Sequence, residues 1–586
     1  MKNSFFWAIK KCFSVCFAGS SFTILLYVGN GLLNPFMVNI VANIINNIDK
    51  YVSSYMNLIF VIIILTLAYM YKQTSEVVSQ FLLDKVRVNL KVLFGRELLD
   101  IRTKFSVADL EMEENYDMIE AVVNNADKKL SGILLSVCII ISLIIEFIGL
   151  FAIISQFSTW VIPAFIFFTL PLVILSFKGG RQVYLEDRGI IKLTRLMKYY
   201  SEALSDKIHV NERTLFGFSE YLNKKYEEAH LKRSNANTAV LAKWMLRIKL
   251  CAIVLIVFTT FVVISMLHSV SIGKLSLGLF ITLSGTIVSL SKRLSQMFSR
   301  LIFDVADQKE YLVELNKFFI MKQKNEYSDF VYEREEFYSL KINNLSYKYP
   351  NSEKYVLKNL NLFLESGKSY SLIGINGAGK STLIKILIGI YKDFEGEVLL
   401  NDKSISEYTD NQLRNIFSIV YQDYAKYQIP LKDNLTFGQD ELWDPAVIDQ
   451  VGLGSVIASL EKGEMTVLGK IEDNGADLSG GEWQKLVIAR ALVRKTPFMI
   501  LDEPTASLSP KMENDFYTNL IEAKKHSTLL LISHRMAASK ITDIIIVLNE
   551  GRIVEQGSHA ELMYKKGQYY IMFESQRRNY SESEEA

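Results

Sequence analysis

The sequence is poor in cysteine and carries almost no net charge. Its 586 residues include four cysteines, and its charged residues sum to only +2. The cysteines stand in apolar surroundings, outside any Cys-x-x-Cys or Cys/His cluster, so a disulfide framework or a cysteine metal site is not expected. A protein that binds nucleic-acid phosphates would show a basic stripe, and this sequence shows none. Nucleic acid is therefore not an expected partner.

Charge is also nearly absent from long stretches of the front half. Half of all residues are hydrophobic, which is a high share for a soluble enzyme of this length. A helix needs about 20 mostly apolar residues to cross a membrane. The first apolar run is too long for a signal peptide, so we interpret it as a membrane helix. We expect membrane helices near 14–40, 56–79, 131–155, 159–178, 248–268 and 275–292.

The connections between these helices predict the orientation of the chain. The loops over 72–129 and 178–249 are long and charged, whereas the other connections are short and carry little charge. Basic residues favour the cytoplasmic side of a membrane, so the long loops, both termini and the back half are expected to be cytoplasmic. Acids and bases alternate over helix-length stretches of these loops, which indicates that they extend the membrane helices into the cytosol.

Glu146 is an acidic residue in the middle of the third predicted span. A carboxylate is costly against lipid, so it should face the interior of the helix bundle or a water-filled cavity. It could contact a substrate or respond to protons, or it could make a hydrogen bond that packs helices together. The sequence leaves these alternatives open.

The pattern changes at about Phe337, where short apolar strands begin to alternate with helices, as in a mixed α/β domain. We therefore predict an all-α transmembrane domain of six helices over 1–320, a linker over 321–336, and an α/β P-loop domain over 337–586.

The segment from Gly374 to Ser381 matches the phosphate-binding P-loop pattern G-x-x-x-x-G-K-[ST] completely. It follows an apolar strand and opens a helix, which is the context that the motif requires. Backbone N–H groups would surround phosphates, Lys380 would reach the terminal phosphates, and Ser381 could ligate magnesium. ATP and Mg2+ are the predicted cofactors. The predicted nucleotide-binding residues here are Gly374, Ile375, Asn376, Gly377, Ala378, Gly379, Lys380, Ser381 and Thr382.

A second apolar strand, which begins at Phe498, ends in two acids. Asp502 suits the magnesium shell, and Glu503 suits a base that polarises the attacking water. A strand that ends in two acids is weak evidence for an ATP-hydrolysing site when it occurs alone, but it is strong evidence when it follows a P-loop.

Between these signals, Leu478 is followed by Ser479-Gly-Gly-Glu482. Ser479 and Glu482 have the spacing of a capping box, so a helix over Glu482–Val493 should present free amides and a positive N-terminus to a phosphate. With these motifs in this order, the back half resembles the nucleotide-binding domain of ATP-binding-cassette (ABC) transporters. The whole chain resembles an ABC half-transporter of the exporter type.

The resemblance implies roles for three further side chains. Tyr349 would stack on adenine, although the neighbouring Tyr347 could be confused with it. Gln422 would reach magnesium and sense the membrane domain, and His534 would contact the γ-phosphate and take part in catalysis. Outside the family pattern these residues would be an ordinary strand tyrosine, a surface glutamine and a core histidine.

The resemblance also implies a partner. Ser479, Gly480 and Gly481 would cap the γ-phosphate of ATP held by the opposite subunit, so one chain with one cassette cannot complete a site. We expect a dimer, most simply a homodimer, because no main motif is degenerate. Ser509 stands where the family has an aspartate that helps to couple the two ATP sites, so this coupling is open to question.

The resemblance suggests a cargo as well. The segments Glu114–Ile119, Leu215–Leu222 and Leu478–Gln484 are similar to bacterial lantibiotic and peptide exporters. We therefore expect an ATP-hydrolysing exporter subunit of a bacterial cytoplasmic membrane with a peptide cargo. A lipid or drug exporter and a siderophore importer of the same fold are alternatives, whereas a soluble ABC protein of translation or repair would lack membrane helices. By resemblance, coupling helices would lie near Ser106–Tyr116 and Tyr200–Asn211.

Overall fold

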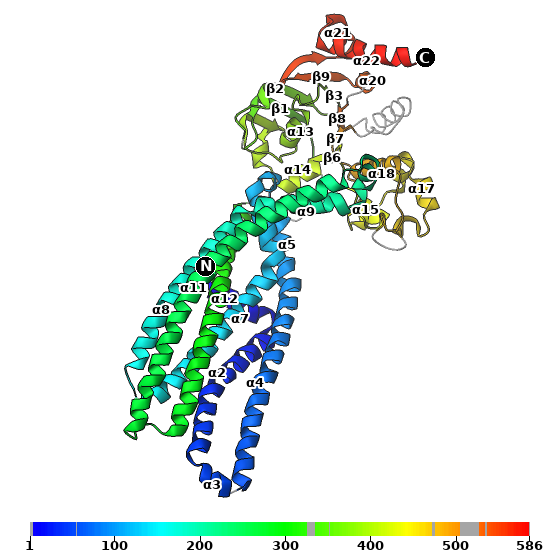
Figure 1. The fold of residues 1–586 in the computed structure, drawn as a ribbon. Coiled ribbons are helices and arrows are strands. Elements are labelled where there is room, and N and C mark those ends of the chain that lie inside the picture. Colours follow the sequence, from blue (N-terminus) through cyan, green and yellow to red (C-terminus); the bar gives the residue numbers. More distant parts are fainter. Residues whose placement is uncertain are drawn as a thin grey trace. The chain divides into compact units, whose positions relative to one another are not determined.

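The computed structural model describes residues 4–53, 55–156, 158–324, 335–350, 352–470, 475–503, 527–533 and 536–584. Contacts divide the chain into two compact units (Figure 1). The first comprises Met1–Phe105 and Asp109–Asn325, and the second comprises Ser106–Ala108 and Glu326–Ala586.

The described part of the front half is helical. Its helices between Phe5 and Lys324 include six that are long and apolar enough to cross a membrane, and each of the six predicted spans falls on one of them. The elements are α1 (Phe5–Val15), α2 (Phe17–Asn46), α3 (Ile48–Ser53), α4 (Tyr55–Asn89), the π-helical turn η1 (Leu90–Phe94), α5 (Gly95–Arg102), α6 (Val107–Glu111), α7 (Glu113–Ile154), α8 (Val161–Gly189), α9 (Ile191–Ser205), the 3-10 turn η2 (Lys207–His209), α10 (Val210–Phe216), α11 (Ser219–Ser271) and α12 (Leu277–Lys324).

Several of these helices are longer than a membrane is thick. Helix α11 has 53 residues, which is about 80 Å at about 1.5 Å per residue, whereas the hydrocarbon core of a bilayer is about 30 Å thick. The charged segments that flank the apolar spans in the sequence are therefore helical, and they extend the membrane helices beyond the bilayer. The short helices α6 and α10 lie in or next to the two segments expected to be coupling helices.

Close helix packing brings α2 against α7. A Cβ atom at Gly31 would lie 2.6 Å from the Ser142 carbonyl oxygen, and one at Gly149 would lie 2.5 Å from Pro35 Cγ. Only glycine fits these positions without movement of the neighbouring helix. Small residues at helix contacts are the usual means of close approach in membranes, because lipid supplies no hydrophobic drive for association.

Polar side chains connect α2 with its other neighbours. The Ser75 hydroxyl on α4 donates to Asn30 Oδ1 at 2.8 Å, and one helical turn away Lys72 Nζ lies 3.4 Å from Asn34 Oδ1. The Asn34 amide in turn donates to Glu146 Oε1 at 2.7 Å. These contacts form a continuous polar seam between α2, α4 and α7.

Glu146 completes this seam with an ion pair. Its side chain is 3% exposed and pairs with Arg293 of α12, whose side chain is 33% exposed. Both the guanidinium and the amide contact Oε1, so this oxygen of the carboxylate is satisfied within the helix bundle. The contacts of Glu146 are thus those of the helix-packing alternative.

The second unit contains two sheets (Figure 1). The smaller sheet is antiparallel, in the order β2-β1-β4-β5, and the larger has the order β10-β9-β3-β8-β7-β6. All pairs of the larger sheet are parallel except β10 with β9. The strands are β1 (Ser339–Tyr347), β2 (Leu357–Glu365), β3 (Ser369–Ile373), β4 (Glu395–Leu400), β5 (Lys403–Ser404), β6 (Phe417–Val420), β7 (Phe498–Asp502), β8 (Thr528–Ile532), β9 (Ile544–Asn549) and β10 (Arg552–Gly557).

Helices alternate with these strands, as the sequence pattern predicts. Strands β3, β7 and β8 are buried along their whole length, which is typical of parallel strands covered on both faces. The helices are α13 (Lys380–Leu387), α14 (Asp410–Ile416), α15 (Leu431–Thr436), α16 (Pro445–Gln450), α17 (Gly454–Ser459), α18 (Gly480–Leu492), α20 (Met536–Ser539), α21 (His559–Lys565) and α22 (Gln568–Glu584), with 3-10 turns at Ile405–Glu407, Asp440–Leu442 and Gly463–Met465.

The ion pair between Glu146 and Arg293 gives a first prediction. Glu146→Gln leaves the guanidinium without its counter-charge, and because Arg293 is one-third exposed we expect a loss of about 1–3 kcal/mol rather than the full cost of a buried charge. Thermal unfolding of the purified protein in detergent should show a lower midpoint. The double variant Glu146→Gln/Arg293→Gln should recover part of the loss, because neither charge is then left alone.

Asp84→Asn is the matched control, because Asp84 forms an exposed pair with Arg87 three residues away. Exposed pairs contribute little, so the midpoint should not move. A double Glu146/Arg293 variant whose loss equals the sum of its single variants would show that the two side chains do not interact.

Candidate functional site

The P-loop follows β3 and leads directly into α13. Gly377 and Gly379 have φ angles of 79° and 104°, a backbone region in which side chains are strained. A Cβ atom at Gly374 would lie 2.2 Å from the Leu548 carbonyl oxygen. Glycine at these positions thus allows the loop to turn tightly beside β9, and Ile375 and Asn376 between them remain exposed.

Lys380 begins α13 and lies across the loop that precedes it. Its Nζ donates to the carbonyl oxygens of Gly374 at 2.7 Å and Ile375 at 3.3 Å, and the residue is 7% exposed. Burial lowers the pKa of Lys380, while the carboxylates of Glu503 and Asp502 oppose that shift. The ammonium group therefore lies within electrostatic reach of both acids that the sequence singles out.

Strand register places these acids near the P-loop. Leu372 pairs with Ile532, which pairs with Asp502, while the preceding Leu501 pairs with Val420. The four parallel strands β3, β8, β7 and β6 therefore end at one edge of the sheet. Ligand sites of open α/β sheets lie outside this carboxyl edge.

Asp502 is 6% exposed at the end of β7. The pKa of Asp502 is raised to about 6, chiefly by burial and then by the neighbouring Glu503, while Lys380 lowers it and Asp423 adds a smaller rise. The charge of Asp423 acts on the Asp502 carboxyl group. Because Asp423 directly follows Gln422 in the sequence, the segment that contains Gln422 lies near Asp502. Gln422 itself is exposed.

Glu503 has an uncommon backbone conformation. Its φ angle is 47°, in the left-handed region that residues other than glycine rarely occupy. Its N–H donates to the Ile532 carbonyl oxygen of β8 at 2.9 Å, which holds the strained residue at the end of the strand. Its side chain is half-buried, in contrast to that of Asp502. Such strain is concentrated at functional sites.

The structure distinguishes the two candidate tyrosines. Tyr347 is 4% exposed and stacks on Tyr391, with ring centroids 5.2 Å apart and an interplanar angle of 13°. Tyr349 is partly exposed, and its hydroxyl shares a hydrogen bond with the Thr382 hydroxyl of α13 at 3.0 Å. Tyr347 is thus a core residue, while Tyr349 lies beside the P-loop helix.

The predicted capping box forms at the start of α18. The Ser479 N–H donates to Glu482 Oε2 at 2.7 Å, and the Glu482 N–H lies 3.4 Å from Ser479 Oγ. These hydrogen bonds lower the pKa of Glu482. A Cβ atom at Gly480 or Gly481 would meet nothing within 4 Å. Packing inside the described chain therefore does not require glycine at either position.

Sequence reasoning missed a buried polar link between α18 and the segment after Gln422. Arg490 donates to the carbonyl and side-chain oxygens of Asn434, both at 2.9 Å, and to the Ala425 carbonyl oxygen at 3.3 Å. Asn434 is fully buried, and burial lowers the pKa of Arg490. One signal in the sequence was a lone arginine in the apolar run of α18.

His534 and Ser509 lie outside the described residues. The sequence places His534 directly after Ser533, which follows the end of β8.

Ser381, Gln422 and Asp502, the residues predicted to hold magnesium, offer a hydroxyl, an amide and a carboxylate oxygen. Oxygen donors of this kind fit Mg2+. Within the described parts of the chain, no group of three or more His, Cys, Asp or Glu residues is placed to hold a metal ion. A site of this kind would need ATP phosphates to complete it, as is usual for magnesium.

Known proteins resemble this chain in sequence and in fold. The sequence model of the family described as ABC transporter matches residues 357–506, which implies nucleotide binding. The subtilin transport ATP-binding protein SpaT of Bacillus subtilis is 29% identical over 86% of this chain and 83% of its own length. The ATP-dependent lipid A-core flippase 2 of Colwellia psychrerythraea is 33% identical over 41% of each chain.

A solved structure of a bacterial Atm1-family ABC exporter with ATP bound has a TM-score of 0.77 to this chain at 20% identity. The match covers 97% of this chain and 99% of the other. It confirms the predicted fold class, in which six membrane helices are joined to an α/β ABC domain.

Proposed function

We propose that this chain, an ABC half-transporter of the exporter type whose ATPase is coupled to transport, works as a homodimer that exports a peptide. The observation that carries the proposal is the shared sheet edge at which the P-loop, Asp502 and Glu503 meet. We place the chain in a bacterial cytoplasmic membrane, with both termini and the ATPase domain in the cytosol. The proposed domains are 1–320, a linker over 321–336, and 337–586.

The described residues support a division of labour in ATP binding. Tyr349 stacks on adenine, because its ring is accessible beside the P-loop helix while Tyr347 is buried. Lys380 binds the terminal phosphates. Its ammonium group then donates to phosphate oxygens in place of the carbonyl oxygens of Gly374 and Ile375. Backbone amides of the P-loop and the first turn of α13 bind the remaining phosphate oxygens.

Ser381, Gln422 and Asp502 would hold Mg2+, which neutralises charge that develops on the phosphate oxygens. Glu503 polarises the water that attacks the γ-phosphate, since its half-buried side chain borders the buried Asp502 at the end of β7. His534, by its expected place after β8, contacts the γ-phosphate.

The site requires a second subunit. Ser479 and the two following glycines begin a capped helix, and a Cβ atom at either glycine would meet nothing within 4 Å in the described chain. Glycine there suits the close approach of a partner's nucleotide. The N-terminus of α18 would then act on the γ-phosphate bound by the other chain.

Two observations favour a peptide over a lipid as cargo. The relative named for subtilin transport matches along most of this chain, whereas the lipid A-core flippase matches over two-fifths. The segments Glu114–Ile119 and Leu215–Leu222, outside the ATPase domain, carry the similarity to lantibiotic and peptide exporters. The membrane domain is the part of a transporter that contacts the cargo. Similarity of sequence in this domain therefore supports a similar class of cargo.

Glu503→Gln should leave ATP binding intact and lower the rate of hydrolysis by about 10²–10⁴-fold, because the amide keeps the shape but loses the charge that polarises water. The rate of phosphate release and the dissociation constant for ATP of the purified protein in lipid nanodiscs test this. Lys380→Ala is the contrasting variant, since it should weaken ATP binding itself. Wild-type hydrolysis by Glu503→Gln would rule out Glu503 as the base.

A mixed dimer tests the shared site. Lys380→Ala removes a phosphate contact in its own chain, whereas Ser479→Arg blocks the ATP site of the partner chain. Each variant homodimer should be inactive, but a mixed dimer retains one intact composite site and should recover ATPase activity. Differently tagged chains, purified by both tags in sequence, supply the mixed dimer. Activity no higher than that of the homodimers would contradict the proposed arrangement or the independence of the two sites.

The cargo class can be tested on the same preparation. A lantibiotic precursor peptide should stimulate the ATPase activity saturably and should appear inside inverted vesicles only when ATP is present. A peptide of scrambled sequence is the control for nonspecific effects, and Glu503→Gln vesicles are the control for leakage. Stimulation by lipids or drugs but by no peptide would favour the alternative cargo classes.

A further inference from the structure

Tyr424 connects two segments of the ATPase domain that the proposed function assigns to different ATP molecules. It lies two residues after Gln422, which would serve the ATP of its own chain, and its hydroxyl donates to the Gly480 carbonyl oxygen at 3.3 Å. Gly480 is the first residue of α18 and belongs to the segment Ser479–Gly481, here called the signature, which would act on the partner's ATP. The Tyr424 ring is half-buried and packs against the apolar cluster that contains Trp483 of α18.

A neighbouring tyrosine has a different environment. Burial raises the pKa of Tyr421, and the charge of Asp502 raises it further. At Tyr424 the rise in pKa comes from burial. Tyr421 therefore lies within reach of the acids of its own chain's ATP site, whereas the hydroxyl of Tyr424 is directed to the start of α18.

The contact with the Gly480 carbonyl also orients the next amide. A peptide group is planar, so the Gly480 carbonyl and the Gly481 N–H lie in one plane and point in opposite directions. Neither glycine has a side chain with which to pack, and a Cβ atom at either would meet nothing within 4 Å in the described chain. A hydrogen bond to the backbone is therefore a direct means of fixing the Gly481 N–H, which has no acceptor within the helix.

Arg490 holds the same segment one residue further on. Its guanidinium donates to the Ala425 carbonyl oxygen at 3.3 Å and to two oxygens of Asn434, both at 2.9 Å. The guanidinium also lies 5.1 and 5.3 Å from the ring centroids of Tyr427 and Phe437. The residues that follow the tyrosine are thus fixed to a later turn of α18. Its hydroxyl therefore contacts the start of this helix from a fixed base.

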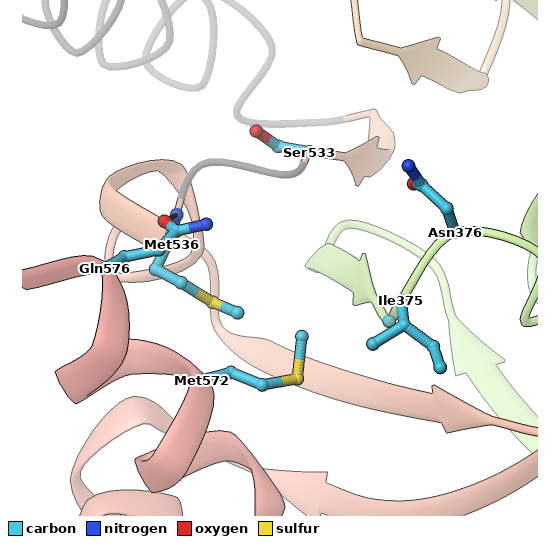
Figure 2. Close-up of a pocket in the computed structure, with 7 residues that line it drawn as sticks. Ile375, Asn376, Ser533, Met536, Met572 and Gln576 are labelled. Carbon is cyan, nitrogen blue, oxygen red and sulfur yellow. Dashed lines mark hydrogen bonds between the residues drawn. The ribbon is translucent and has the colours of Figure 1, made fainter. Parts of the chain in front are cut away.

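The P-loop has different neighbours in its own chain. Ile375 and Asn376 line a cavity of about 260 Å³ together with Met536 of α20 and Met572 and Gln576 of α22 (Figure 2). Among the residues that the structure describes, none of α18 belongs to this lining. On this side, the start of α18 is therefore not needed to enclose the P-loop of its own chain.

We infer that Tyr424 is a positioning residue for the ATP bound by the partner subunit, which acts by holding the peptide group between Gly480 and Gly481. The inference rests on the proposed function, in which the signature acts across the dimer. It gives a residue of the Gln422 segment a role at the opposite ATP site, which no motif in the sequence indicates.

The mixed dimer of the proposed function contains one complete ATP site. Its Ser479→Arg chain supplies the P-loop, and its Lys380→Ala chain supplies the signature. With Glu503→Gln in both chains, equilibrium binding of radiolabelled ATP with Mg2+ in nanodiscs reports on this site without hydrolysis. Tyr424→Phe in the Lys380→Ala chain should raise the dissociation constant about threefold, the effect of one modest hydrogen bond. The same change in the Ser479→Arg chain should not raise it, because the signature of that chain is already blocked.

Tyr408→Phe in either chain is the matched control. The Tyr408 hydroxyl also donates to a backbone carbonyl oxygen, that of Leu400 at 2.9 Å, outside α18. Its loss should leave the dissociation constant unchanged. A purely structural role of Tyr424 would weaken binding equally from both chains, together with a lower unfolding midpoint.

Equal dissociation constants for the two placements of Tyr424→Phe would overturn the inference. Weaker binding only from the Ser479→Arg chain would also overturn it, because Tyr424 would then serve the ATP of its own chain. The ATPase activity of the mixed dimer with Glu503 and Tyr424 intact tests the proposed function separately. If that activity is recovered but the two placements are equal, only the positioning role fails; if it is no higher than in the homodimers, the proposed arrangement fails and the inference with it.

Discussion

The register of four parallel strands is the constraint on which the rest of the ATP site depends. Because β3, β8, β7 and β6 run in one direction and end together, each chain segment that leaves the sheet starts from the same edge. A parallel sheet requires a crossover connection between successive strands. The strand ends, which are far apart in the sequence between residues 373 and 533, are therefore brought to the same edge. The pKa of Asp502, which burial, Glu503 and Asp423 raise and Lys380 lowers, is an electrostatic sign of this convergence.

A different constraint governs the membrane helices. Lipid offers no polar partner, so an ionisable side chain within the helix bundle pairs with groups of other helices. Glu146 finds a guanidinium and an amide, and the asparagine that supplies the amide also faces Lys72. Such contacts are costly to break in lipid, and they bind α2, α4, α7 and α12 into a unit. Close approach at Gly31 and Gly149 adds packing where hydrophobic association is absent.

Much of this fold could be predicted from the sequence because its signals are local. Apolar length indicated the six spans, and the P-loop glycines and the capping box at Ser479 are short patterns with a single geometric interpretation. The partner of Glu146 could not be predicted, since Arg293 is 147 residues away. The same applies to the hydrogen bonds of Arg490 with Asn434. The choice between Tyr347 and Tyr349 needed the fold, because only packing decides which of two neighbouring rings is buried.

A Cβ atom added at either of the two glycines after Ser479 would meet nothing within 4 Å in the described chain, and this has a consequence for genetics. A substitution that meets nothing inside a subunit leaves folding, membrane insertion and expression level unchanged. Screens that select for well-expressed or heat-stable protein would then retain such variants as if they were neutral. In a cell that carries both alleles, the altered subunit would enter dimers with the normal one. Under the proposed arrangement, the altered signature would impair the ATP site on the normal subunit's P-loop, while the other composite site of the mixed dimer would stay intact.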